Sequence, residues 1–204
     1  MQKRDNIVSL IVGGRGRRKT SYVKNVLWPL RNDRRIIIVD TFDNPVWHHM
    51  SPTVDDKPLI PERGEYKIPI IREDDLLDKT KGIFRIFSSN TDDLLSEIQL
   101  KCRNCTVLIE DATRFLEGNL DESVKRFVLD TKQTNIDLLM VFHSLSDTPP
   151  KLGRWSDYLT LFKTQEEFDS TIKKKFSNPQ VKVLFDKIAA SKDPFVNGTV
   201  CLRA

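Results

Sequence analysis

The amino-acid sequence predicts an α/β fold in which helices cover a mostly parallel central sheet. Short runs rich in Ile, Val and Leu recur along the chain without polar alternation, as expected for strands that are buried on both faces. Segments with helical periodicity separate several of these runs, so strand and helix alternate. The length of 204 residues is enough for a hydrophobic core without disulfides or metals, and we expect a single domain over residues 1–204.

The expected elements follow one another along the chain. The apolar runs that predict the sheet lie at residues 7–12, 35–40, 83–87, 106–109, 138–143 and 158–162. Helical periodicity covers residues 20–30, 91–101 and 122–131, and in the last of these Val124, Phe127 and Val128 recur at spacings of three and four residues. The C-terminal part, residues 165–204, is expected to form two charged helices at 165–175 and 179–190 and a final strand at 198–202.

The segment at residues 44–72 interrupts this alternation. It contains five prolines and little periodicity, so we expect a long irregular excursion, which in a compact protein is usually functional or disordered. Its aromatic and basic side chains suit either stacking on nucleic-acid bases or a subunit interface, and the interface is slightly favoured. These side chains are Trp47, His48, His49, Arg63 and Tyr66.

Composition excludes several classes of protein. The chain has 33 Lys and Arg against 29 Asp and Glu, a formal charge of +4, which by itself is too mild to indicate nucleic-acid binding. Three cysteines and no apolar leader predict an intracellular protein without a disulfide framework. Cys102 and Cys105 have zinc-ligand spacing, but a structural zinc site needs about four ligands, so we expect no metal other than magnesium. The longest apolar runs are far shorter than the roughly 20 residues of a membrane span.

A nearly complete phosphate-binding pattern lies at residues 11–21, IVGGRGRRKTS. It matches G-x-x-x-x-G-K-[ST] except at one position, and it lies between a predicted strand and a predicted helix. Backbone N–H groups would surround the β-phosphate, Lys19 would reach the β- and γ-oxygens, and the Thr20 hydroxyl would bind magnesium. We therefore predict ATP and Mg²⁺ as cofactors, with a nucleotide-binding set of Gly13, Gly14, Arg15, Gly16, Arg17, Arg18, Lys19, Thr20 and Ser21.

Arg18 is the exception, because it occupies the place of the second glycine. Its side chain must point away from the phosphates, and its backbone must adopt the angles that glycine normally supplies. The alternative is a glycine turn before a basic helix start. Cations at a helix N-terminus oppose the helix macrodipole unless an anion is present, so the basic cluster favours a phosphate site.

An acidic pair follows an apolar strand in CTVLIEDATRF, residues 105–115. In phosphate-loop enzymes one acid at such a strand end holds the magnesium shell and the next orients or deprotonates the attacking water. We assign Glu110 to magnesium and Asp111 to water, although the usual order is Asp before Glu and the two roles are exchangeable. The alternative, that Asp111 caps a helix starting at Ala112, is weakened by the phosphate loop earlier in the chain.

A third strand, DLLMVFHS at residues 137–144, brings His143 and Ser144 to the same sheet edge. Open parallel sheets gather function at the carboxyl ends of their strands, so His143 is expected to sense the γ-phosphate. An ordinary hydrogen-bonded histidine is the alternative. Asp40, at the end of RIIIVD, has the same position and the same ambiguity.

Together, GGRGRRKTS, IIIVDTFDN, VLIEDATRF and LLMVFHSLSDTPP resemble the motifs of the HerA/FtsK superfamily of P-loop motor ATPases, over about residues 6–164. The resemblance is greatest to small DNA-packaging ATPases of membrane-containing icosahedral viruses. It implies a P-loop NTPase three-layer sandwich and a homo-oligomeric ring, hexameric in the family, that hydrolyses ATP and drives double-stranded DNA into a preformed capsid. Capsid vertex proteins would be partners, in the host cytoplasm or on the virion.

Besides Arg18 and the inverted acidic pair, two further positions depart from the family pattern. The family commonly has glutamine where this chain has His143. Its members also carry an arginine that reaches the nucleotide of a neighbouring subunit, and the matching residue here is Lys132, which cannot form the bidentate fork. Either Lys132 completes the catalytic set or an arginine replaces it; the candidates are Arg114, Arg126 and Arg154.

Two other functions are compatible with these motifs. A small-molecule P-loop kinase has a similar length, but adjacent acids at one strand end and a polar sensor on another suit hydrolysis better. A nucleotide-binding assembly protein with little hydrolysis is the second alternative, and Arg18 and Lys132 are the arguments for it.

Overall fold

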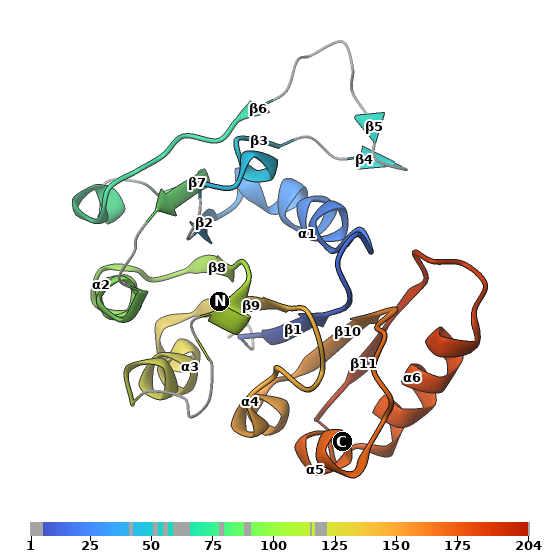
Figure 1. The fold of residues 1–204 in the computed structure, drawn as a ribbon. Coiled ribbons are helices and arrows are strands. Elements are labelled where there is room, and N and C mark those ends of the chain that lie inside the picture. The colour runs from blue at the N-terminus through green and yellow to red at the C-terminus, as the bar shows by residue number, and fades with distance from the viewer. Residues whose placement is uncertain are drawn as a thin grey trace.

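The computed structural model describes residues 6–40, 43–50, 53–54, 57–58, 66–77, 80–87, 91–114, 116 and 122–203. Its centre is a seven-stranded sheet in the order β11-β10-β1-β9-β8-β2-β7 (Figure 1). All neighbouring strands are parallel except the antiparallel pair β10 and β11, which confirms the predicted mostly parallel sheet. The strands are β1 (Val8–Val12), β2 (Arg35–Asp40), β7 (Gly82–Phe87), β8 (Cys105–Ile109), β9 (Ile136–Phe142), β10 (Tyr158–Phe162) and β11 (Asn197–Cys201).

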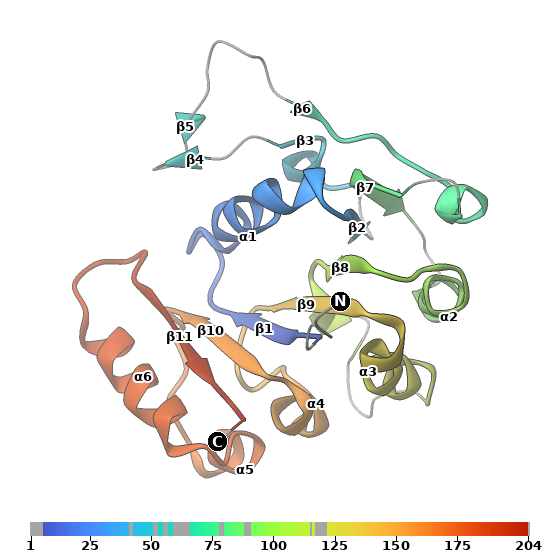
Figure 2. The ribbon, with the colours of Figure 1, turned by 180° about the vertical axis from the view of Figure 1, so that it is seen from behind.

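Helices cover both faces of the sheet and give three layers (Figure 1 and Figure 2). One face carries α1 (Lys19–Leu27), which continues as the 3-10 helix η1 (Trp28–Asn32). The other face carries α2 (Thr91–Lys101), α3 (Glu122–Thr134), α4 (Pro150–Trp155), α5 (Ser170–Lys175) and α6 (Pro179–Ala190).

The hydrophobic core divides in the same way. Alternate side chains of β2 point to opposite faces, as in any strand. Ile36 and Ile38 belong to the cluster that contains Val23 of α1, whereas Ile37 and Val39 belong to the cluster under α2 to α6. Every residue of β2 is buried, which explains why the sequence shows a continuous apolar run instead of alternation.

The proline-rich segment has more structure than the predicted irregular excursion. It contains the 3-10 helix η2 (Pro45–Trp47), a ribbon of β3 (His49–Met50) and β6 (Tyr66–Lys67), and the short pair β4 (Thr53–Val54) and β5 (Lys57–Pro58). Trp47 is fully buried and joins Met50 and Ile68 in the α1 cluster. The prediction that Trp47 stacks on bases or forms an interface is therefore wrong, because its side chain completes the core.

The other described side chains singled out in this segment, His48, His49 and Tyr66, lie at or near the surface. His48 is 2.9 Å from Asp43 through Nε2 and Oδ1, and His49 is exposed. Tyr66 is 39% exposed and packs edge-to-face on Trp28. Arg63 lies outside the described residues, so its prediction stays untested.

Several element boundaries differ from the predicted ones. The first of the two C-terminal helices begins only at Ser170, where the Asp169 side chain accepts a hydrogen bond from Ile172 N at 2.8 Å. The sequence reading missed two short elements that precede β10 and β7, namely α4 and the 3-10 helix η4 (Glu73–Leu76). Strand β9 begins earlier than predicted and ends at Phe142, so His143 lies just beyond the strand.

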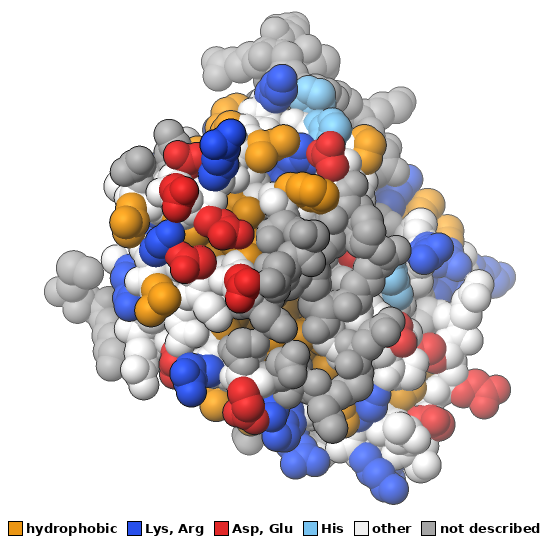
Figure 3. All heavy atoms as spheres, turned by 60° about the vertical axis from the view of Figure 1, so that its left-hand side comes forward, with side chains coloured by type: hydrophobic (Ala, Val, Ile, Leu, Met, Phe, Trp, Pro, Cys, Tyr) orange, Lys and Arg blue, Asp and Glu red, His pale blue; other side chains and the backbone are white. Residues whose placement is uncertain are grey.

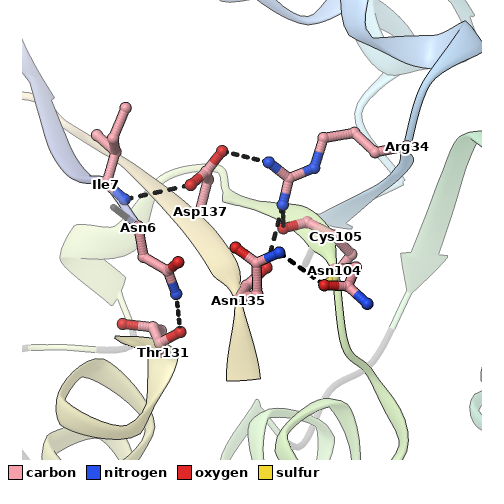
Figure 4. A network of polar contacts seen from close by, with 8 residues as sticks. All are labelled: Asn6, Ile7, Arg34, Asn104, Cys105, Thr131, Asn135 and Asp137. Atoms are coloured by element: carbon pink, nitrogen blue, oxygen red, sulfur yellow. Dashed lines mark hydrogen bonds and ion pairs between the residues drawn. The ribbon is translucent and has the colours of Figure 1, made fainter. Parts of the chain in front are cut away.

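A polar network ties together the amino ends of the parallel strands (Figure 4). Arg34 precedes β2 and donates to Asp137 Oδ2 at 2.6 Å and to Asn135 O at 3.1 Å. Asp137 in turn accepts from Ile7 N at 3.2 Å. Both Arg34 and Asp137 are buried, so the network aligns the starts of three strands.

The composition led us to expect no disulfide framework and no membrane-spanning segment. Cys102 and Cys105 are free, fully buried thiols, and Cys201 is exposed. No helix in the described ranges is long and apolar enough to cross a bilayer.

Candidate functional site

Strand order places three of the predicted motifs side by side. Strand β9 lies between β1 and β8, so His143, after β9, is flanked by the loop at residues 13–18 and by the acidic pair. The carboxyl ends of parallel strands meet at one edge, and the structure thereby gathers residues that are more than 120 positions apart in sequence.

The loop at residues 13–18 is tightly fixed against neighbouring strands. Gly13 N donates to Phe142 O at 3.2 Å, and Gly14 N donates to Lys163 O at 3.1 Å. A Cβ atom on Gly13 would lie 2.4 Å from the Cβ of Phe162, so only glycine permits this approach of β10. Gly16 adopts φ +69°, a left-handed conformation that glycine takes without steric cost.

Arg18 adopts the conformation that the missing glycine would supply. Its backbone has φ 64° and ψ 21°, a left-handed geometry that costs a non-glycine residue about 1–2 kcal/mol. Its guanidinium carbon lies 3.7 Å from the centre of the Phe195 ring, and such a cation–π contact stabilises by about 0.5–2 kcal/mol. The contact is therefore large enough to offset most of the backbone cost.

Lys19 is held at the mouth of the loop. It is 7% exposed, and its Nζ donates to the carbonyl oxygens of Gly13 and Gly14. Burial lowers the pKa of Lys19, while the nearby charges of Glu110 and Asp111 act in the opposite direction. These carboxylates therefore stabilise an ammonium group that burial alone would disfavour. Thr20 and Ser21 follow in the first turn of α1, and both are half-buried.

Glu110 is the most perturbed acid of the site. Burial raises its pKa to about 7, against the opposing effect of the Lys19 charge. Its Oε2 atom is buried and has no hydrogen-bond partner within the described part of the chain. The Lys19 charge and the Trp47 side chain favour the carboxylate form but do not outweigh the effect of burial. Because a buried acceptor without a partner is costly, Glu110 is suited to receive a cation.

Asp111 and His143 form a contact across the two loops. Asp111 Oδ1 lies 3.2 Å from His143 Nε2, and Asp111 adopts φ 50°, which turns it out of the strand direction. A 3-10 helix, η5 (Ala112–Arg114), does begin after Asp111. The side chain of Asp111 nevertheless faces the histidine, a contact that was not predicted from the sequence.

His143 faces cations as well as this carboxylate. Burial and the charges of Lys19 and Arg15 lower its pKa, and Asp111 partly counteracts them. Its Nδ1 is buried and lacks a hydrogen-bond partner among the residues that the structure describes. The imidazole therefore keeps one ring nitrogen for another group.

Glu166 fixes the loop that carries His143, and the sequence reading did not single it out. Its two carboxylate oxygens accept from Leu145 N and Ser146 N, both at 2.8 Å. Glu166 lies 20 residues or more from these partners in sequence, and no spacing pattern marks it. It also borders a pocket of about 420 Å³ beside the loop, together with Arg15, Arg17, His143 and Ser144.

The other candidates either make contacts of their own or have side chains outside the described ones. Asp40 is 2% exposed and pairs with Arg85 at 3.1 Å, which stabilises the end of β2, and its charge also helps to raise the pKa of Glu110. Lys132 lies on α3, but its side chain is outside the described ones, as is that of Arg114. Arg126 on α3 and Arg154 on α4 are both exposed.

Comparison with known proteins supports the fold assignment through structure and not through sequence. No family model matches the chain, and no curated protein matches it in sequence. The genome packaging NTPase B204 of Sulfolobus turreted icosahedral virus 2, solved with ATP-gammaS, is similar in structure with a TM-score of 0.71 and 12% identity over 100% of this chain and 94% of that one.

Two further solved structures share the fold. The DNA-packaging ATPase B204 of Sulfolobus Turreted Icosahedral Virus aligns with a TM-score of 0.62 and 14% identity, over 93% of this chain and 90% of that chain. The pCW3 conjugation coupling protein TcpA, with ATPgS, aligns with a TM-score of 0.50 and 13% identity, over 87% of this chain and 54% of that chain. The chain therefore has the P-loop NTPase fold predicted from its sequence.

Proposed function

We propose that this protein is a Mg²⁺-dependent ATPase that translocates double-stranded DNA. The observation that carries the proposal is the meeting of Lys19, Glu110 and the Asp111–His143 pair at one sheet edge, with His143 Nε2 3.2 Å from Asp111 Oδ1. A cation, two adjacent carboxylates and a polar sensor beside a glycine loop are the parts that phosphoryl transfer to water requires.

The residues fit a nucleotide and a magnesium ion. The unpartnered, buried Oε2 of Glu110 is a hard oxygen donor, the ligand type that Mg²⁺ prefers. Thr20 and Glu110 would hold the ion, which when bound neutralises charge that develops on the phosphate oxygens. Lys19 would exchange the carbonyl oxygens of Gly13 and Gly14 for phosphate oxygens.

Asp111 and His143 would divide the remaining chemistry. Asp111 would orient the attacking water and accept its proton. His143 would report the γ-phosphate, because an anion near Nδ1 favours the imidazolium form, which donates from both ring nitrogens. The Asp111 carboxylate would therefore contact both the attacking water and His143. Lys132, or an arginine in its place, would reach the nucleotide of a neighbouring subunit.

We further propose that the ATPase packages a genome and assembles as a ring. Both proposals are supported by the structural likeness to two B204 packaging ATPases. An oligomer also needs a contact surface, and the edge strand β7 and its surroundings provide apolar side chains: Ile70, Leu77 and Phe87 are 59%, 64% and 52% exposed. Figure 3 shows hydrophobic side chains among acidic and basic ones on this side of the molecule.

The deciding experiment is ATP hydrolysis with Mg²⁺, with and without double-stranded DNA, for wild type and Lys19→Ala. Lys24→Ala is the matched control, because Lys24 lies on the same helix and donates to His49 O on the protein surface. We expect DNA-stimulated hydrolysis that Lys19→Ala abolishes and Lys24→Ala preserves. Nucleotide binding without turnover would favour an assembly role, and stimulation by a metabolite instead of DNA would favour a kinase.

A further inference from the structure

The connection between α6 and β11, residues 191–196, reaches the nucleotide loop through several contacts. Arg18 stacks on Phe195 at 3.7 Å, and Arg17 Nη1 donates to Pro194 O at 3.4 Å. Lys163, whose carbonyl accepts from Gly14 N at 3.1 Å, donates through Nζ to Ser191 O at 2.7 Å. The connection therefore contacts Arg17 and Arg18 directly and is joined to Gly14 through Lys163.

Hydrogen bonds within the connection hold its conformation without help from Arg18. Asp193 N donates to Ser191 Oγ at 3.1 Å, and Asp193 Oδ1 accepts from Phe195 N at 2.9 Å. Val196 packs against the main hydrophobic cluster. These contacts fix the Phe195 backbone independently of the nucleotide loop, so its ring presents a defined surface to the guanidinium.

We propose that Phe195 is a positioning residue of the nucleotide loop, whose ring holds Arg18 in the left-handed conformation that this loop otherwise obtains from glycine. Arg18 immediately precedes Lys19, and its φ of 64° sets the direction in which the helix begins. If the ring were lost, Arg18 would relax toward φ values that side chains prefer. The Lys19 ammonium and the first N–H groups of α1 would then lose their alignment on the phosphates.

This inference rests on the proposed nucleotide binding. A positioning role of Phe195 and a purely structural role predict different results. A structural role would weaken the protein whatever residue stands at position 18. A positioning role through Arg18 disappears when glycine supplies the conformation directly. The distinguishing comparison is therefore Phe195→Leu in two backgrounds, wild type and Arg18→Gly.

The experiment measures the Kd of Mg-ATP for wild type, Phe195→Leu, Arg18→Gly and the double variant. We expect Phe195→Leu to raise Kd roughly fivefold in wild type, the effect of losing one cation–π contact, and less than twofold in the Arg18→Gly background. Phe195→Tyr should keep the wild-type Kd because the ring is retained. Lys182→Ala is the matched control, since Lys182 stacks on Phe168 in the same C-terminal part and should leave Kd unchanged.

An equal rise of Kd in both backgrounds, or no rise in either, would overturn the proposal. The melting temperatures of the same four proteins, measured without nucleotide, give a second cycle. If wild type bound no nucleotide, the proposed function would fail. A coupling between positions 18 and 195 in melting temperature would then still support the positioning contact, and additive effects would exclude it.

Discussion

Buried charges lie at both ends of the parallel strands, here called the amino edge and the carboxyl edge of the sheet. The two edges differ in how these charges are paired. At the amino edge, Arg34 and Asp137 are paired at 2.6 Å and bonded to surrounding backbone (Figure 4). At the carboxyl edge, Asp40 is also paired, with Arg85 at 3.1 Å. Glu110, however, has a pKa raised to about 7, and buried atoms of Glu110 and His143 lack hydrogen-bond partners within the described ranges.

Backbone strain follows the same division. The turns at the amino edge place Asn104 and Asn135 at φ 54°, and asparagine tolerates the left-handed region well. The carboxyl edge places Arg18 and Asp111 there, at a larger cost for arginine. The paired charges of Arg34 and Asp137 and the tolerant asparagines stabilise the first edge. Unpartnered buried atoms and backbone strain at the second edge support the proposed ligand site there.

The largest expected effect tests the amino edge. Arg34→Met leaves Asp137 buried without its cation, so the free energy of unfolding should fall by about 3–5 kcal/mol, as measured by urea denaturation. The double variant Arg34→Met, Asp137→Leu should recover most of this loss. Lys182→Met, which breaks an exposed pair with Asp186, should change stability by less than about 1 kcal/mol. If Arg34→Met lowered the free energy of unfolding only slightly, the amino edge would not be the stabilising element described above.

The next effect belongs to the carboxyl edge. Glu110→Gln keeps the size of the side chain but removes the charge that would hold magnesium, so ATP hydrolysis should fall by about a hundredfold or more. The measurement is steady-state turnover at saturating ATP and Mg²⁺. Glu97→Gln on α2, where Glu97 pairs with Lys101, is the control and should retain activity. Unchanged turnover in Glu110→Gln would move the catalytic acid elsewhere.

Gly13→Ala tests how tightly the two neighbouring strands fix the loop. The new Cβ would lie 2.4 Å from Phe162 Cβ, so we expect a loss of about 1–3 kcal/mol in unfolding free energy and weaker nucleotide binding. Gly198→Ala is the matched control. Its Cβ would meet the flexible Cδ1 of Leu184 at 2.6 Å, a methyl group that can move, so its effect should be smaller. Equal losses would mean that the loop is looser than its contacts indicate.

The smallest effect is the pH dependence of stability at Glu110. Its folded-state pKa of about 7 lies above the ordinary value of 4.5, so the folded protein binds a proton that the unfolded chain releases between these pH values. The unfolding free energy therefore loses this contribution as pH rises from 4.5 to 7. Glu110→Gln should match wild type near pH 4.5 and exceed it by about 1–2 kcal/mol at pH 8, after allowance for partial solvent access. A gap that widened toward low pH would contradict the raised pKa.

The sequence predicted where the candidate residues lie better than it predicted their surroundings. Local motifs placed Lys19, Glu110 and His143 at one end of the sheet, because strand ends and glycine turns leave a signature within a few residues, and the structure brings them together there. The burial of Trp47 was not predicted. The local sequence around an aromatic residue between prolines is the same whether its side chain is exposed or packs under a helix. Glu166 carried no local signal, because its partners Leu145 and Ser146 are brought to it only by the chain's return through β10.

By itself, then, the sequence determined the alternation of strand and helix, the parallel sheet and the edge at which the loop at residues 13–18, the acidic pair and His143 lie. These depend on periodicity and on short motifs, which are local properties of the chain. Only the tertiary structure decided that Asp40 belongs to an ion pair with Arg85, that Asp111 faces His143, and that Phe195 supports the arginine in the glycine position. Such contacts join residues distant in sequence, and their formation depends on how the folded elements pack.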